Sequence, residues 1–387
     1  MTFKEMYRRF ENEVDVCKFQ RDCGLRFLLV RSLDKPNLKE LIEKHQGKPV
    51  CTKGVKVEEL MERAFELDCS DEDFINFIKS KKQALLVARK KEIEGLDGVL
   101  DVLPIVNCGV RNDKVDDIVQ KFVRNKSLKT IDALYENLDD VILPCIRQYC
   151  LWSYFNQTSN DIIETLFLEH DLVVPTLRKI HDIDFFVNVE GKYIPFDLKI
   201  THVSDDYFEL LSQGLNIGSG EDDFIANSNG ISELDKIKDF YKQLKQKSKD
   251  LNLPNLSGLS KSDIIAQIEK CQSKSCDDFI SKAKRDRSSL VSNTTKNLKT
   301  LEWWNYKYQG ERLFCNNNRI YLFLSNKRDF GDARELKADV KNIKKVVNAL
   351  MSSIKKSSIH NINYVYEKDD RHKGAYTAKS LSTIYCK

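Results

Sequence analysis

Charged side chains interrupt an otherwise apolar stretch, HDIDFFVNVEGKYIPFDLKITHV, at residues 181–203. The stretch is typical of two short strands joined by a tight turn around Gly191. Asp184 opens the first strand, and Asp197 and Lys199 lie on the second. Because residues i and i+2 of a strand point to the same face, Asp197 and Lys199 share a face. Antiparallel pairing of the two strands would bring Asp184 level with Asp197.

Two carboxylates that converge in a partly buried hairpin repel each other, and they are costly to bury unless something compensates for their charge. Mg²⁺ compensates well, because it prefers hard oxygen ligands, usually one or two carboxylates together with water and phosphate oxygens. A neighbouring ammonium group can orient a water molecule and offset charge at a scissile phosphate. The pattern therefore indicates metal-assisted phosphodiester hydrolysis. The alternative is a solvent-exposed strand face that carries a single Asp–Lys pair.

The chain of 387 residues is long enough for two or three structural units. Residues 1–157 show helical periodicity with few Gly or Pro and are a candidate region for DNA recognition or dimerisation. Residues 204–318 indicate a second, basic helical insertion that is a candidate for DNA binding. Between and after these regions, residues 158–203 and 319–387 carry the strand-like segments. We therefore expect an α+β protein in which a mixed β-sheet is flanked by helices.

The two strand-bearing segments have a definite order of elements. A helix is expected to begin at the capping residues near Thr158, and three strand-like runs follow it up to residue 203. A strand at 319–326 and a long helix at 332–356 come next. Two further strand-like runs near the end of the sequence could close the sheet.

An acid at the start of one strand, a short hairpin and Asp-x-Lys on the next strand resemble the PD-(D/E)xK nuclease superfamily, whose best-known members are restriction endonucleases. The resemblance is specific over residues 158–203 and does not extend to residues 1–150. It implies a restriction-endonuclease-like core, an α/β unit with a mixed sheet. It also implies that Asp184, Asp197 and the Leu198 carbonyl bind Mg²⁺, with Mn²⁺ as a substitute.

The same resemblance assigns two further roles. Lys199 would position the attacking water, and Glu164 on the preceding helix would hold a metal-bound water or a second metal. No Pro precedes Asp184, where the superfamily's name has one, and Asp182 is a rival for the role of Asp184. Glu164 lies off the apolar face of its helix, so a solvated helix residue is the alternative for this position.

A basic segment indicates how a polyanion could be held. Residues 236–300 contain 15 Lys and Arg against 7 Asp and Glu, a net charge of +8 in a chain whose total is +4. Thr201 continues the face of Asp197 and Lys199 and is a further phosphate candidate. Trp303 and Trp304 are either stacking platforms for bases or core aromatics. The expected DNA-contacting cations are Lys282, Lys284, Arg285, Arg287, Lys296 and Lys299; the alternative is a solvated helical surface.

These observations lead to a magnesium-dependent endonuclease that cuts double-stranded DNA, of the type II restriction endonuclease kind. Cutting both strands favours a homodimer, and a cognate methyltransferase would be encoded elsewhere. The alternatives are an effector nuclease of an anti-phage system that needs a signal or partner, a catalytically silent DNA-binding protein on the same fold, and a nuclease that acts on RNA.

The distribution of cysteines and the hydropathy of the sequence indicate the cellular compartment that we expect for the protein. The 11 cysteines are scattered and form no CxxC pair, which is typical of reduced thiols rather than of structural zinc or a disulfide framework. The first residues are charged where a signal peptide needs an apolar run, and no stretch approaches 18 apolar residues. We expect a cytoplasmic protein without membrane association.

Overall fold

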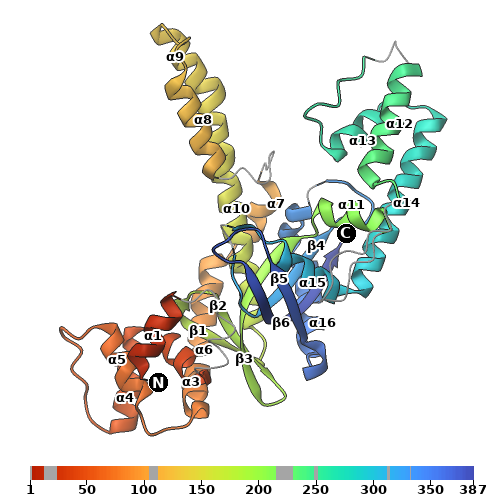
Figure 1. Ribbon diagram of the computed structural model, residues 1–387. Helices are drawn as coiled ribbons and strands as arrows, with labels where there is room; N and C mark the ends of the chain where they lie inside the picture. The colour runs from red at the N-terminus through yellow and green to blue at the C-terminus, as the bar shows by residue number, and fades with distance from the viewer. Residues whose placement is uncertain are drawn as a thin grey trace.

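A computed structural model describes residues 2–12, 24–103, 112–214, 230–247, 252–311, 314–331 and 333–387. Helices surround a six-stranded mixed sheet with the order β1-β2-β3-β4-β6-β5 (Figure 1), which confirms the expected mixed α+β class. Neighbouring strands β1, β2 and β3 are antiparallel, β3, β4 and β6 are parallel, and β5 pairs antiparallel with β6 at the edge. The strands are β1 (Val173–Ile180), β2 (Ile183–Val189), β3 (Lys192–His202), β4 (Arg319–Ser325), β5 (His360–Tyr366) and β6 (Gly374–Cys386).

The hairpin between β2 and β3 fixes the register of the central strands. Its turn residues Glu190 and Gly191 have φ values of 51° and 83°, the left-handed pair that a tight two-residue turn requires. The side-chain oxygen of Asn188 accepts a hydrogen bond of 2.9 Å from the Gly191 amide and so holds the turn closed. The resulting register pairs Phe185 with Phe196. The next pair along the two strands is therefore Asp184 and Asp197.

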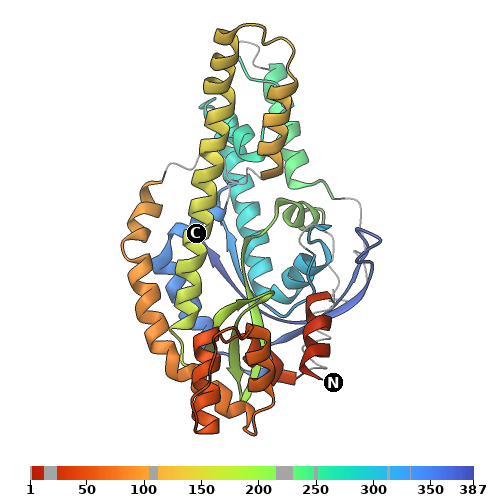
Figure 2. The ribbon, with the colours of Figure 1, turned by 90° about the vertical axis from the view of Figure 1, so that its left-hand side faces the viewer.

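Helices cover both faces of the sheet (Figure 2). On one face, α10 (Leu143–Leu168) and α16 (Val340–Ser352) pack on Phe185, Phe196 and Leu322 through an apolar cluster. On the other face, α11 (Asp205–Ser212) and α15 (Leu298–Lys307) pack on aromatic residues of β4 and β5. Alternate side chains of each strand point to opposite faces of the sheet and thus belong to two separate hydrophobic cores.

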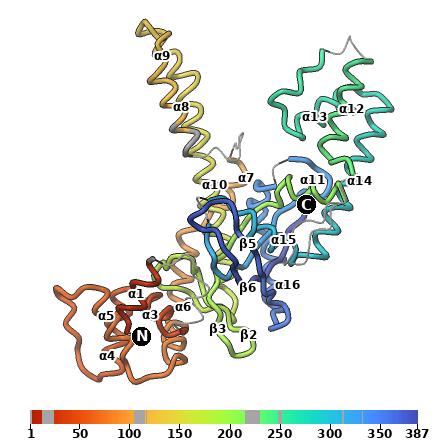
Figure 3. The backbone as a smooth tube through the Cα atoms, in the orientation of Figure 1, coloured from red at the N-terminus to blue at the C-terminus, as the bar shows by residue number. Residues whose placement is uncertain are grey.

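A helical lobe packs against the β1–β2 end of the sheet (Figure 3). The Ser32 carbonyl accepts 2.8 Å hydrogen bonds from the amides of Leu177 and Arg178, which ties the lobe to β1. The predominantly helical character expected for the N-terminal region is confirmed for its described residues. The helices of the lobe are α1 (Phe3–Asn12), α3 (Gly24–Arg31), α4 (Lys35–Gln46), α5 (Val57–Phe65) and α6 (Asp71–Ile93).

The expected helix start near Thr158 is wrong, because α10 runs through that position. Helix α9 (Ile131–Asn137) continues through a π-helical turn (Leu138–Ile142) into α10. Ser159 does not cap a helix; its hydroxyl donates back to the Asn156 carbonyl at 3.2 Å within the helix. The boundary drawn at residue 157 therefore lies inside one helix that joins the N-terminal region to the core.

Two helical projections extend from the sheet (Figure 1). One consists of α8 (Asn112–Arg124), α9 and the first half of α10, and the short α7 (Leu96–Val102) lies near its base. The other is the insertion between β3 and β4, with α12 (Glu233–Lys247), α13 (Lys261–Glu269) and α14 (Lys274–Lys296). No helix in the described ranges is long and apolar enough to cross a membrane.

The helix expected at 332–356 is shorter and divided. A 3₁₀ segment, Ala333–Ala338, comes first, and Asp339 then caps α16 by accepting a hydrogen bond from the Asn342 amide. A further 3₁₀ turn, Lys356–Ser358, leads into β5. The Asp339 cap explains the break, because its side chain satisfies an amide that has no partner inside the helix.

Candidate active site

Asp184 and Asp197 form the centre of the candidate site. The amide of Leu198, the residue after Asp197, donates a 2.7 Å hydrogen bond to Asp184 Oδ2. Burial and the neighbouring Asp197 carboxylate raise the pKa of Asp184 to about 7. In the absence of a cation, Asp184 is therefore partly protonated near neutral pH. The structure brings together the two acids that the strand pattern predicted to be level.

Lys199 follows on the same face of β3, two residues after Asp197. Its side chain remains accessible to solvent. Crowding by surrounding protein atoms and the guanidinium of Arg319 nevertheless lower its pKa, against the opposing effect of Asp197. A lysine whose pKa is lowered spends more time as the neutral amine, which can accept a proton.

Glu164 lies near the pair on α10, but it already has a partner. Arg89 on α6 holds its Oε1 at 2.7 Å. The Glu164 carboxylate nonetheless contributes to the raised pKa of Asp184. The alternative interpretation of Glu164 as a purely solvated helix residue is therefore wrong. The ion pair with Arg89 also limits the freedom of the Glu164 carboxylate to bind a metal directly.

Arg319, at the start of β4, is a residue that the sequence pattern did not single out. Its side chain is buried, and its Nε lies 3.4 Å from Asp197 Oδ2. The guanidinium also lies over the Tyr306 ring and contacts the Gln309 side chain at 3.3 Å. It thus supplies a fixed positive charge beside the two acids. No local signal marks it, because the contact depends on the parallel pairing of β3 with β4.

A polar cavity of about 360 Å³ lies beside the two acids and Glu164, and Arg319 is not part of its lining. Glu164, Asp184, Asp197 and Leu198 line it together, whereas Lys199 lies outside its lining. Three charged residues of the lining were not predicted as site residues: Asp161, one turn before Glu164 on α10, and Arg89 and Lys179. The i, i+3 spacing of Asp161 and Glu164 was the available signal, since it places both acids on one side of a helix.

Asp182 does not take the place of Asp184. It lies in the turn between β1 and β2 with a φ of 62° and pairs with His181. Its side chain does not line the cavity, and its carbonyl accepts a 3.2 Å hydrogen bond from Asn317. The left-handed conformation that Asp tolerates explains its presence at this turn.

The donor set fits a hard divalent cation. No three His, Cys, Asp or Glu side chains in the described ranges converge to form a ready-made metal site. Mg²⁺ does not require such a cage, because one or two carboxylates with substrate and water oxygens suffice. Asp184 and Asp197 offer two carboxylates, and their mutual repulsion would be relieved by positive charge. They fit Mg²⁺ or Mn²⁺ better than zinc, which favours His and Cys ligands.

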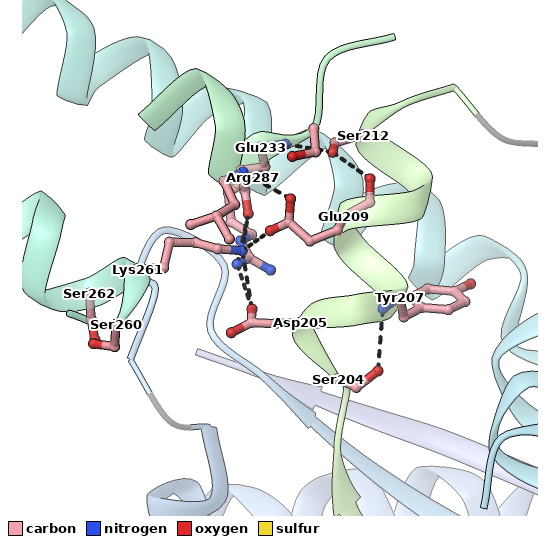
Figure 4. Close-up of polar contacts among 12 residues, drawn as sticks. Ser204, Asp205, Tyr207, Glu209, Ser212, Glu233, Ser260, Lys261, Ser262 and Arg287 are labelled. Atoms are coloured by element: carbon pink, nitrogen blue, oxygen red, sulfur yellow. Dashed lines mark hydrogen bonds and ion pairs between the residues drawn. The ribbon is translucent and has the colours of Figure 1, made fainter. Parts of the chain in front are cut away.

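Arg287 is not the surface cation that the basic segment led us to expect. Its side chain is only 3% exposed and lies inside an ion-pair network that joins α11, α12, α13 and α14 (Figure 4). Its Nη2 lies 3.1 Å from Asp205 and 2.9 Å from Glu233. Lys261 contacts the same two carboxylates and also Glu209. Arg287 therefore holds the insertion together and is unavailable to DNA.

The remaining basic candidates divide into two groups. Lys282, Arg285, Lys296 and Lys299 are exposed, whereas Lys284 pairs with Glu269 at 2.8 Å.

The other phosphate candidate, Thr201, is half-buried, with its hydroxyl 3.4 Å from the His202 carbonyl.

The two tryptophans belong to the core. Trp303 and Trp304 are buried in the cluster beneath α15 and are not available to stack on bases. The core alternative is therefore the correct one for both residues.

One exposed cation belongs to a larger basic surface. Lys296 lines a hollow of about 720 Å³ between α14, α16 and the end of β6. Lys327, Lys345 and Lys387 line the same hollow, and Asp339 is its acidic member. Asp339 is engaged by the Tyr385 hydroxyl. A surface with four ammonium groups attracts phosphate oxygens, although the sequence pattern located only one of its members.

Comparisons with protein-family models, curated proteins and solved structures find no match for this chain.

Proposed function

We propose that this protein is a divalent-metal-dependent endonuclease that hydrolyses phosphodiester bonds of double-stranded DNA. The observation that carries the proposal is the pairing of Asp184 with Asp197 at a polar cavity, with Lys199 two residues after Asp197 on β3. The order of α10, three antiparallel strands and a parallel fourth strand supports a restriction-endonuclease-like core. A type II restriction enzyme is the form of this function that we favour.

Different residues of the chain would bind the metal and accept the proton in the proposed reaction. Asp184, Asp197 and the Leu198 carbonyl would hold Mg²⁺, or Mn²⁺ in its place. A bound cation would neutralise the two acids and stabilise charge that develops on the phosphate. Lys199 Nζ accepts the proton of the attacking water as the water oxygen bonds to phosphorus. The ester P–O bond breaks, and the leaving oxygen takes a proton from solvent. Its lowered pKa suits this role.

Two arginines position the acids. Arg319 fixes the Asp197 carboxylate from the side of β4, and Arg89 fixes Glu164 from the side of α6. Preorganised charges of this kind reduce the rearrangement that the reaction requires. Both residues are therefore positioning residues in the proposal, and neither is assigned contact with the phosphate.

Duplex DNA is favoured as the substrate because exposed cations recur along α14 of the insertion. Lys282, Arg285 and Lys296 recur on one stripe of α14, and Lys296 continues into the lysine-lined hollow. Such a stripe suits the regular phosphate spacing of a duplex. The arrangement does not specify a base sequence, because base readout requires groove contacts.

A digest of unmethylated plasmid and phage DNA tests the proposal. The intact protein is incubated with Mg²⁺ or with EDTA, alongside Asp197→Asn, Lys199→Ala and Asp182→Asn variants. Cleavage that requires Mg²⁺, disappears in the first two variants and persists in Asp182→Asn is the expected result. Asp182 is the matched control because it is a nearby acid outside the cavity lining.

The pattern of products separates the forms of the function. Discrete fragments identify a sequence-specific restriction enzyme, and a metal-dependent smear identifies an unspecific effector nuclease. DNA that is bound but never cut contradicts the nuclease proposal and favours a silent DNA-binding protein. A parallel digest of RNA that is cut in place of DNA contradicts the choice of substrate.

A further inference from the structure

Residues 112–150, which we call the arm, extend from the sheet as a helical hairpin (Figures 1 and 2). The arm contains α8, α9, the π-helical turn and the start of α10. Among the arm residues whose side chains the structure describes, Ile142 alone is buried. A hairpin with so little buried surface draws little stability from its own packing, because helices in water depend mainly on tertiary contacts. We therefore expect a second protein surface to bury the apolar side chains of the arm.

The exposed apolar residues of the protein are concentrated on this projection. Of the large hydrophobic side chains that are exposed in the described chain, most lie between Val99 and Tyr154. Single exposed apolar residues are normal, but a concentration of them marks an interaction surface. Their spacing is helical, with i, i+3 and i+4 steps that place them on shared helix faces. Those on the arm are Val119, Val123, Ile131, Leu134, Tyr135, Val141 and Leu143.

The charges of the arm indicate which partner fits. Residues 121–129, at the end of α8 and in the following loop, carry four basic and no acidic side chains, whereas residues 132–140, in α9 and the π-helical turn, carry four acidic and no basic ones; the start of α8 is of mixed charge. A polyanion such as DNA would be repelled by the acidic half, and an acidic protein would meet the same obstacle. A second copy turned through a two-fold axis places the basic half of each arm against the acidic half of the other. The two sets are Lys121, Arg124, Lys126 and Lys129, and Asp132, Glu136, Asp139 and Asp140.

We propose that the arm is the dimerisation surface of this protein, with the arm of a second copy as its occupant. Two helical hairpins that pack face to face form a four-helix bundle, the standard way for amphipathic helices to bury their apolar faces. The charge pairing sets the antiparallel sense of the two arms, and the apolar residues supply the buried area. The proposal stands on the arm alone and does not depend on the chemistry of the candidate active site.

Sedimentation equilibrium of the intact protein tests this surface. Wild-type protein is expected to be a dimer, and a Val123→Glu/Tyr135→Glu double variant is expected to be a monomer with unchanged circular dichroism. Val87→Glu is the matched control, because Val87 is a helical valine outside the arm that is 59% exposed, against 68% for Val123. This control should remain dimeric.

A charge-exchange experiment tests the predicted orientation. One variant converts the four basic residues of segment 121–129 to Glu, and another converts the four acidic residues of segment 132–140 to Lys. Each variant alone is expected to be monomeric, and an equimolar mixture is expected to form a heterodimer. A wild-type monomer, a dimer that survives the double variant, or two charge variants that fail to associate when mixed would overturn the proposal. None of these outcomes depends on whether the protein cuts DNA.

Discussion

Asp184 and Asp197 occupy opposing positions on β2 and β3, and the amide that follows Asp197 donates to the Asp184 carboxylate at 2.7 Å. Asp184 therefore accepts a favourable hydrogen bond from a backbone amide and is repelled by the Asp197 carboxylate at the same position. The amide stabilises a charged Asp184, whereas burial and Asp197 oppose that charge and prevail. The pair is therefore a local source of instability that protonation or a cation relieves.

The first prediction concerns pH. The pKa of Asp184 is about 7 in the folded protein, above the value of about 3.9 for an unfolded aspartic acid. Between pH ~4 and pH ~7, Asp184 is protonated in the folded protein but ionised in the unfolded chain. The free energy of unfolding therefore has its full contribution from Asp184 below pH ~4 and loses it as pH rises through ~7. In EDTA, Asp184→Asn should be more stable than wild type at pH 8, by on the order of 3 kcal/mol, and no more stable at pH 4.

Urea unfolding at a series of pH values measures this difference. Asp182→Asn is the control, because Asp182 is a neighbouring acid that does not line the cavity. Equal stability of Asp184→Asn and wild type at pH 8 would mean that Asp184 ionises normally and that the acids do not repel each other as described.

The second prediction concerns the cation. Mg²⁺ that binds only the folded protein must raise its melting temperature, by an amount set by its concentration relative to Kd. Wild-type protein should show this rise at pH 8, and Asp184→Asn and Asp197→Asn should lose it. Thermal unfolding with and without Mg²⁺, in the absence of DNA, supplies the measurement. The same rise in all three proteins would place the cation elsewhere.

The hairpin was predictable from sequence because its determinants are local. Gly191 marks the turn, and the alternation of apolar and polar residues sets the faces of the strands, so the approach of Asp184 to Asp197 follows from a few neighbouring residues. Arg319 was not predictable, because it reaches Asp197 across parallel strands that are separated by the whole insertion. The course of α10 was missed for another reason: Ser159 resembles a helix cap but bonds back to its own helix.

The third prediction separates two neighbouring arginines of α14. Arg287 is buried with its charge shared between Asp205 and Glu233, whereas Arg285 is exposed. Arg287→Ala would remove one of the two cations that contact the buried Glu233 and leave Lys261 as the other, and it should destabilise the protein by ~1–3 kcal/mol. Arg285→Ala should change stability by less than ~0.5 kcal/mol. Urea denaturation compares the two, and equal stabilities would contradict the structural role of the network in Figure 4.

The fourth prediction concerns salt and the exposed cations. If Lys282, Arg285 and Lys296 contact DNA phosphates, each neutralises one charge and releases condensed counterions on binding. Replacing any one by Ala should weaken binding to all duplex sequences and reduce the slope of log Kd against log salt concentration by about 1. Lys284→Ala is the matched control on the same helix, because Lys284 is engaged by Glu269. Fluorescence anisotropy with a labelled duplex, in EDTA to prevent cleavage, gives the slopes. Unchanged slopes in all three variants would show that α14 presents a solvated face, and the lysine-lined hollow would then be the surface to test next.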